Sequence, residues 1–294
     1  MKRKCILLAI LLISVLAVCE EPTVQLARVR RLSAAELADI RERANHGDSD
    51  AQLILGLAYD GANKTIKPDV AEARRWYEMS ASHGNVDAQF WLVGLDYEQG
   101  QKPPAIRSRY LELAKRGHVG AMSLYASMCA DGAGGPKDFS SAMSWWKKAA
   151  ELGSREGAFN VGIMYLDGEG VPIDKKIAVE WLKRAAESGS VEAASRLGPM
   201  ALLSEGGLQP GPDATRWLKT AAEAGDSLAM FDLGMVLFHG LGTDPDYAEA
   251  YKWFTLASER GQVDGRKGML PKMTNEQVAK AEKLADAWNA EHKD

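Results

Sequence analysis

The chain has 294 residues, of which 46% are apolar and 26% charged, so it can bury a sizeable core and lacks the composition of a disordered protein. Its 36 Lys and Arg residues against 40 Asp and Glu residues give a net charge of −4, which offers no electrostatic basis for binding nucleic acid or an anionic membrane surface. Three cysteines are too few for a disulfide-rich scaffold.

The N-terminus has the features of a secretory signal peptide. Lys2, Arg3 and Lys4 form a basic start, and an apolar run over residues 6–18 follows. This run is shorter than the roughly 20 residues that a membrane-spanning helix needs. We therefore expect residues 1–18 to be a signal peptide that is removed on export.

Two kinds of cleavage site fit the next residues. Residues 15–17 fit a general signal peptidase, whereas residues 16–19 resemble the lipobox of bacterial lipoproteins, in which Cys19 would carry the lipid. Val18 departs from the lipobox, because that position usually holds a smaller residue. The sequence favours lipidation, so we expect a periplasmic protein, freely soluble or anchored at the outer membrane through Cys19, with residues 19–32 as a flexible tether.

Seven glycines recur at an almost constant separation, and we call them the period glycines. They are Gly47, Gly84, Gly117, Gly153, Gly189, Gly225 and Gly261. The first two intervals are 37 and 33 residues, and each later one is 36. A second series of glycines stands nine residues after four of them, at Gly56, Gly162, Gly198 and Gly234. A shared period in several series predicts internal repeats, which we number one to six from these glycines.

A tryptophan stands eight residues before most of the period glycines. The series is Trp76, Trp145, Trp181, Trp217 and Trp253, and only repeat two departs from it, with Arg109. We expect each tryptophan to fill the space between neighbouring repeats. Small residues at the other repeated positions would let adjacent helices approach closely.

Each repeat is expected to be a pair of helices. In residues 153–189, apolar side chains first recur at the three- and four-residue spacing of an amphipathic helix. The loop 167–172 contains glycines and Pro172 and ends that helix, and Asp174 is a candidate N-cap for the next one. Gly189 then ends the second helix and starts the next repeat.

The repeat resembles the Sel1-like family, a relative of the tetratricopeptide repeats. The matching positions of repeat one are Gly47, Ala51, Leu55, Gly56, Tyr59, Ala73 and Trp76. The resemblance covers about residues 44–261, most of the chain that would remain after cleavage. It implies an all-α fold, a right-handed α-solenoid of six helix-pair Sel1-like repeats that binds other proteins.

Capping boxes predict a helix at each end of the repeats. Ser33 with Glu36 would open an N-terminal capping helix over residues 33–46, and Thr274 with Gln277 would open a helix in the C-terminal capping segment 262–294. The solenoid itself is expected over residues 47–261.

Two repeats depart from the pattern. Repeat two is short and contains Pro103-Pro104, so its interhelix loop is expected to be trimmed. Repeat five carries Pro199 in its first helix, which is expected to kink or end that helix near Gly198.

No set of residues predicts catalysis, metal binding or a cofactor. His46, His83 and His118 adjoin period glycines in equivalent turns, which stacked repeats would hold too far apart for one metal ion. We expect these histidines, and His239 in its loop, to be exposed. Cys129 lies in an apolar helix at the family's tyrosine position and is expected to be a buried free thiol.

The predicted function is that of a non-enzymatic scaffold, adaptor or regulator in a bacterial envelope. The family resemblance implies an envelope protein as partner, such as a sensor, secretion or exopolysaccharide component. One alternative is a structural protein associated with the cell wall or its glycan. Another is a hydrolase like the β-lactam-acting relatives, although those carry a cysteine pair in each repeat and this chain does not.

A partner is expected on the concave face, which the first helix of each repeat lines in related solenoids. The candidate contact residues are Phe90, Trp91, Phe159, Ile163, Phe231 and Met235. Large apolar side chains on an exposed face suit a partner helix or an extended peptide. The alternative is that they pack between adjacent first helices. Repeat five has Ser195 and Pro199 at the same offsets, so a gap is expected there.

Overall fold

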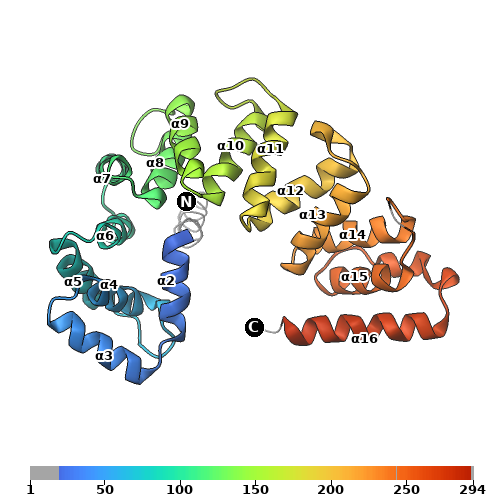
Figure 1. Cartoon of the computed structure of the whole chain (residues 1–294), viewed down its shortest axis with the longest axis horizontal. Helices are drawn as coiled ribbons and strands as arrows, with labels where there is room; N and C mark the ends of the chain where they lie inside the picture. Colours follow the sequence, from blue (N-terminus) through green and yellow to red (C-terminus); the bar gives the residue numbers. More distant parts are fainter. Residues whose placement is uncertain (1–19, 243, 293–294) are drawn as a thin grey trace. The chain divides into compact units, whose positions relative to one another are not determined.

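The computed structural model describes residues 20–242 and 244–292, which form α-helices joined by short loops and contain no β-strand (Figure 1). The chain divides into two compact units, residues 1–157 and 158–294. Each unit is built from successive helix pairs, which confirms the predicted all-α repeat architecture. The predicted signal segment and Cys19 lie outside the described residues.

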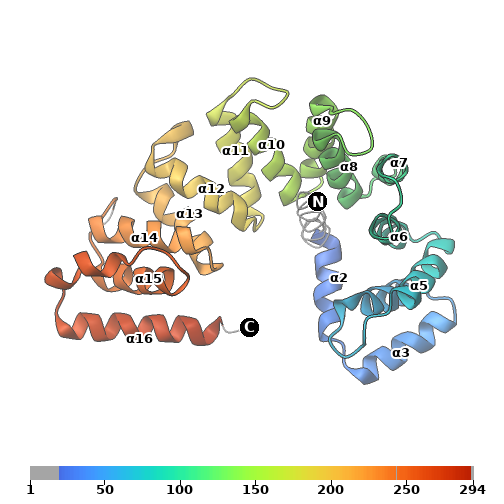
Figure 2. The same ribbon diagram turned by 180° about the vertical axis from the view of Figure 1, so that it is seen from behind.

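The helices of the first unit are α2 (Glu20–Arg31), α3 (Ala34–Asn45), α4 (Ser49–Leu57), the π-helical turn η1 (Ala58–Ala62), α5 (Val70–Ser82), α6 (Val86–Glu98), α7 (Pro103–Lys115), α8 (Val119–Asp131) and α9 (Phe139–Glu151). From α3 to α9, each helix packs against the next (Figure 2).

The helices of the second unit are α10 (Arg155–Asp167), which begins just before the boundary, α11 (Lys175–Glu187), α12 (Val191–Leu202), α13 (Pro212–Glu223), α14 (Ser227–His239), α15 (Tyr247–Glu259) and α16 (Asn275–Glu291). Three short 3-10 turns join them: η2 (Glu205–Gly207), η3 (Gly265–Gly268) and η4 (Leu270–Lys272). From α11 to α16, each helix packs against the next.

The period glycines end helices in the left-handed backbone conformation. All seven have φ between 86° and 97°. A side chain is strained in this region, whereas glycine adopts it readily. At Gly47, Gly84, Gly117, Gly225 and Gly261 an added Cβ atom would meet nothing within 4 Å. Backbone conformation, not lack of space, therefore requires glycine at those five positions.

The second glycine series is required for a different reason, because two helices approach each other closely at these positions. A Cβ atom at these glycines would lie 2.3–2.9 Å from a side chain of the second helix of the same repeat. The pairs are Gly56 with Tyr77, Gly162 with Leu182, Gly198 with Leu218 and Gly234 with Phe254. In each pair the partner is the residue directly after a tryptophan of the repeat series.

The tryptophan series is only partly buried. Trp217 is 2% exposed, and Trp76 and Trp253 are buried as well. Trp145 and Trp181 are half-buried, so for these two members the filling of the space between repeats stays a prediction. The neighbouring residues Trp146 and Leu182 are buried instead.

Residues 20–31 form α2, so a flexible tether is the wrong description of that part of the expected range 19–32. Val29 and Leu32 are buried against the first repeat. The side-chain amide of Asn63 donates hydrogen bonds to the backbone carbonyls of Val29 (2.6 Å) and Leu32 (3.1 Å). The apolar residues Leu26, Val29 and Leu32 recur every three positions, and this spacing was the overlooked signal.

The terminal helices carry the expected capping boxes. Ser33 Oγ accepts a hydrogen bond from the backbone of Glu36, whose side chain accepts from the backbone of Ser33. Thr274 and Gln277 do the same for α16. No helix in the described part of the chain is long and apolar enough to cross a membrane.

Pro199 does not end its helix. α12 runs through it to Leu202, so the expected end near Gly198 is wrong. Pro199 is exposed and stands close to the C-terminus of α12, where its missing N–H removes only the bond to the Ser195 carbonyl. In repeat two, Pro103 and Pro104 are the first residues of α7, where no helical donor is needed.

Candidate binding groove between α12 and α14

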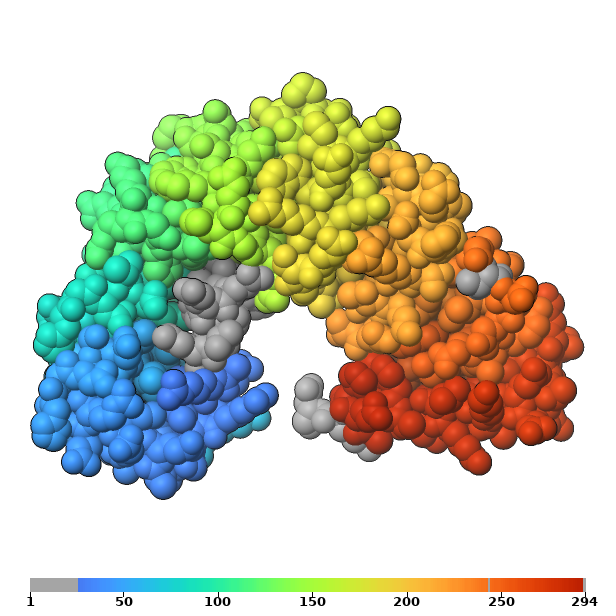
Figure 3. Space-filling view, in the orientation of Figure 1, coloured from blue at the N-terminus to red at the C-terminus, as the bar shows by residue number. Residues whose placement is uncertain are grey.

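A groove of about 540 Å³ lies in the second unit, on the first helices of repeats five and six. The helices that form it are coloured yellow to orange in Figure 3. α12 contributes Ser195, Arg196, Pro199 and Met200, and α14 contributes residues of its first two turns. The side chain of Leu218, from α13, also lines it.

Two large apolar side chains that line this groove are exposed to solvent. Leu203, directly after α12, is 72% exposed, and Leu228, in the first turn of α14, is 63% exposed. Leu228, Asp232 and Met235 are spaced as i, i+4 and i+7 and therefore share one face of α14. Met235 is also exposed, so this face offers apolar contact beyond the groove itself.

Both exposed leucines depart from the repeat pattern. Three residues after the earlier period glycines stand Asp50, Asp87, Gly120, Glu156 and Glu192, where repeat six has Leu228. Fourteen residues after the other period glycines stand Gly61, Glu98, Asp131, Asp167 and His239, where repeat five has Leu203. Comparing offsets would therefore have found both leucines, which the search for aromatic anchors missed.

Two carboxylates line the same groove, and they differ in their partners. Asp226 caps α14: its Oδ1 accepts from the backbone N–H groups of Leu228 (3.0 Å) and Ala229 (3.1 Å), and its Oδ2 accepts from Ser195 Oγ (2.5 Å). Asp232 is half-buried and has no hydrogen bond or ion pair with any described residue. Its burial, and secondly the charge of Asp226, raise the pKa of Asp232.

The remaining charges of the groove are Glu205 and Arg196. Glu205 pairs with Lys175 (2.5 Å). Arg196 forms no ion pair among the described residues and is exposed. The groove thus has an apolar rim, one free cation and an acidic side formed by Asp226 and Asp232.

Phe90 and Trp91 are not available to a partner. They are 1% and 5% exposed, so their prediction as contact residues is wrong. The Phe90 ring stacks on that of His118 at 4.5 Å and packs against Tyr110 at 5.7 Å. Because His118 is the N-cap of α8, the alternative of packing between adjacent first helices holds here.

The other predicted contact residues lie in the second unit. Phe159, Ile163 and Phe231 are half-buried, and Phe231 packs against Phe254 with ring centroids 5.4 Å apart. Met235 is exposed on the α14 face. The gap expected at Ser195 and Pro199 is instead part of the groove. Whether any of these residues contacts a partner stays a prediction.

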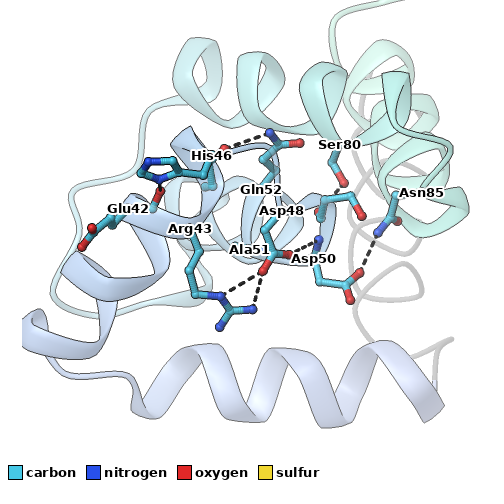
Figure 4. A network of polar contacts seen from close by, with 11 residues as sticks. Glu42, Arg43, His46, Asp48, Asp50, Ala51, Gln52, Ser80 and Asn85 are labelled. Atoms are coloured by element: carbon cyan, nitrogen blue, oxygen red, sulfur yellow. Dashed lines mark hydrogen bonds and ion pairs between the residues drawn. The ribbon is translucent and has the colours of Figure 1, made fainter.

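The histidines belong to the junctions between helices. Figure 4 shows His46 at the first of these junctions, with Nδ1 2.8 Å from the Glu42 carbonyl. The buried Gln52 nearby donates to the Ala44 carbonyl (2.9 Å) and lies 3.0 Å from His83 Nδ1. His239 is exposed, as expected.

His118 contradicts the expectation of an exposed turn histidine. Its side chain is 7% exposed, its Nδ1 accepts from the Ala121 backbone (3.0 Å) and its Nε2 lies 3.1 Å from Asp87. It thus caps α8 and packs on Phe90 at once. Among residues 20–242 and 244–292, no cluster of three or more His, Cys, Asp or Glu side chains could hold a metal ion.

Cys129 is buried and free, as predicted. Arg107 Nη2 lies 3.2 Å from its sulfur, and the same guanidinium lies over the ring of Tyr125. These contacts place the thiol within the packing of α7 against α8.

The repeats match a known family model, the Sel1 repeat, over residues 49–85, 119–154, 155–190, 191–226 and 227–262. The chain belongs to the Sel1 repeat family. Sel1 repeat proteins generally bind other proteins. The model does not match residues 86–118, although this Sel1 repeat protein forms the helix pair α6 and α7 there.

Solved structures of Sel1 repeat proteins share the fold. A Sel1 repeat protein from Oxalobacter formigenes is 31% identical with a TM-score of 0.64, over 73% of this chain and 89% of that one. A protective antigen present in uropathogenic Escherichia coli strains, which displays an SLR fold, is 29% identical with a TM-score of 0.69. That match covers 87% of this chain but only 56% of the antigen chain. No curated protein was found to match.

Proposed function

We propose that this chain is a non-enzymatic scaffold or regulator of a bacterial envelope that binds a segment of another protein. The Sel1 repeat fold supports protein binding in general. The proposed binding site rests on two exposed leucines, Leu203 and Leu228, at the groove between α12 and α14.

The energetics of the groove favour a macromolecular segment. Fully burying one leucine side chain contributes roughly 1.5–3 kcal/mol, so covering Leu203 and Leu228 together would supply a substantial part of a binding energy. Exposed apolar side chains at a groove suit a peptide with apolar anchors, since a few such anchors contribute most of the binding energy of an interface.

The test is site-specific photo-crosslinking in the native envelope. A photo-reactive residue is placed at Leu228 and, as a matched control, at Ile173, which is apolar and equally exposed at 64% but lies outside the groove. We expect a discrete crosslinked protein from position 228 and none from 173. Equal crosslinking at both positions, or none at 228, would contradict the proposal.

Two alternatives give different results with the same protein. A cell-wall or glycan-associated structural protein would sediment with purified peptidoglycan, and mutation of Leu228 would not release it. A hydrolase would turn over a β-lactam at a rate proportional to the concentration of the protein. Under our proposal neither sedimentation nor turnover occurs.

The envelope location rests on the sequence of residues 1–19. If Cys19 is lipidated, the protein partitions with membranes and into detergent, and Cys19→Ser releases it to the soluble periplasm. The partner is then expected to be an envelope protein, such as a sensor, secretion or exopolysaccharide component. A mature N-terminus at Val18 by mass spectrometry would leave simple secretion in place of lipidation.

A further inference from the structure

Asp232 places a half-buried carboxylate on α14, inside the groove. It makes no hydrogen bond and no ion pair with a described residue, and both its burial and the nearby charge of Asp226 disfavour its ionised form. A partly desolvated charge without a partner destabilises a protein. In the same groove, Asp226 caps a helix and Glu205 pairs with Lys175, so Asp232 is the exception.

The repeat itself shows that an acid is not needed at this position. Asp232 stands seven residues after its period glycine. The same offset holds the buried residues Ile54, Trp91 and Leu124 in repeats one to three, and the polar residues Asn160 and Arg196 in repeats four and five. Apolar, amide and basic side chains are thus all compatible with the fold at this offset, and repeat six is the one of the six repeats that places an acid there.

The surroundings of Asp232 define the chemistry that would complement it. Leu228 stands one helical turn before it on the same face of α14, and Leu203 and Pro199 from the other side of the groove are exposed as well. With Glu205 paired to Lys175, the charged groove residues that form no ion pair with a described residue are Asp226, Asp232 and the cation Arg196. A ligand that buries the leucines must therefore also meet excess negative charge.

Resting on the proposed function, we infer that this groove binds a protein segment in which a lysine or arginine stands beside bulky apolar side chains. The cationic group pairs with Asp232, and the apolar side chains pack on Leu203 and Leu228. Such a pair is formed in a partly desolvated place, where opposite charges discriminate strongly between partners. Asp232 is then a specificity-determining residue, while the leucines supply much of the affinity.

The experiment is selection of random nonapeptides displayed on phage against the purified full-length protein, its Asp232→Asn and Asp232→Arg variants, and the control Asp286→Arg. Asp286 is an exposed carboxylate on α16, outside the groove. We expect the unaltered protein and the control to enrich peptides with a basic residue next to apolar ones. Asp232→Arg should enrich acidic peptides in the place of basic ones.

Affinity and folding are then measured for one enriched peptide. Its Kd should rise at least tenfold with Asp232→Asn and stay unchanged with Asp286→Arg, and its binding should weaken with added salt. Thermal melts check that the variants fold, and the near-isosteric Asp232→Asn keeps the test valid if the arginine variant does not. No enriched peptide, no basic preference, or the same preference in Asp232→Arg would each overturn the inference.

The outcome is separable from that of the proposed function. If position 228 crosslinks to a protein while the peptides show no basic preference, protein binding stands and only the chemistry of the partner is wrong. If position 228 gives no crosslink, a basic-apolar peptide that binds through Asp232 still supports the inference about the groove.

Discussion

Arg109 and Asp96 form an ion pair at two positions where repeats one and four carry aromatic residues. Arg109 takes the place of the series tryptophan, and Asp96 stands twelve residues after Gly84, the offset of Tyr59 and Tyr165 in their repeats. Arg74 also binds Asp96, at 2.6 Å. Repeat two thus departs from the pattern at both positions, and the two residues that replace the aromatic ones pair with each other.

The first prediction concerns this cluster. Asp96→Ala should lower the free energy of unfolding at pH 7 by about 2 kcal/mol, because it leaves the partly buried Arg109 without an ion pair and Arg74 with only its longer pair to Glu78 (3.7 Å). Arg109→Ala should cost only about 1 kcal/mol, since Arg74 remains bound to Asp96. Urea denaturation measures both. Glu223→Ala is the control, since Glu223 forms an exposed pair with Lys219 whose loss should cost less than about 0.5 kcal/mol.

The repeat period and helix ends were predictable because they depend on local backbone conformation. Each period glycine follows the end of a helix and has φ near 90°, a conformation that favours glycine. The period glycines therefore identify these helix ends directly from the sequence. The capping boxes at Ser33 and Thr274 are local in the same way.

The exposure of a helix face was not predictable from offsets alone. Phe90 and Phe231 stand at the same offset, yet Phe90 is buried under His118 while Phe231 is half-buried against Phe254. Their environments depend on which residues the neighbouring helices contribute. The groove at Leu228 depends in the same way on side chains from several segments, which no single repeat contains.

The second prediction is a pH dependence set by Asp60. Protein atoms packed around the Asp60 carboxyl desolvate it and raise its pKa from the ordinary 3.8 to about 6, although the residue keeps an exposed edge and Tyr77 donates a hydrogen bond to it (3.1 Å). The folded state therefore binds a proton more tightly than the unfolded state between pH 4 and pH 6, so stability contributed by Asp60 is present at low pH and lost as pH rises through 6. Because Asp60 is exposed and solvent screens its charge, Asp60→Asn should stabilise the protein at pH 8 by only about 1 kcal/mol.

The matched control for Asp60 is Asp131→Asn, which changes an exposed carboxylate at the end of α8. Chemical denaturation at several pH values should show the gain from Asp60→Asn shrinking towards zero near pH 4, and no such trend for Asp131→Asn. A gain from Asp60→Asn that is constant across this range would mean that its carboxyl does not titrate near pH 6.

The third prediction separates two members of the tryptophan series. Trp217→Ala should cost about 3–5 kcal/mol, because the ring is almost fully enclosed. Trp181→Ala should cost less than half as much, since its half-buried ring lies under the guanidinium of Arg184 and gives up fewer contacts. Urea denaturation of both variants measures the difference. Equal losses would show that the half-exposed ring is as important to packing between repeats as the enclosed one.

The fourth prediction distinguishes the two reasons for glycine in the repeat. Gly225→Ala should cost about 1–2 kcal/mol through its left-handed backbone alone, since a Cβ atom there meets nothing. In Gly198→Ala the new methyl group would lie 2.4 Å from Leu218 Cδ2, so overpacking of about 1–3 kcal/mol opposes the gain in helix propensity. The two single changes could therefore have similar costs.

A double-mutant cycle with Leu218→Ala tells the two glycines apart. Removing the leucine side chain gives the methyl group of Gly198→Ala room, so that double variant should be at least about 1 kcal/mol more stable than the sum of the single changes implies. Gly225→Ala combined with Leu218→Ala should be additive, because backbone strain at Gly225 does not depend on that side chain. Additive losses in both cycles would show that close approach of α12 and α13 is not what requires glycine at position 198.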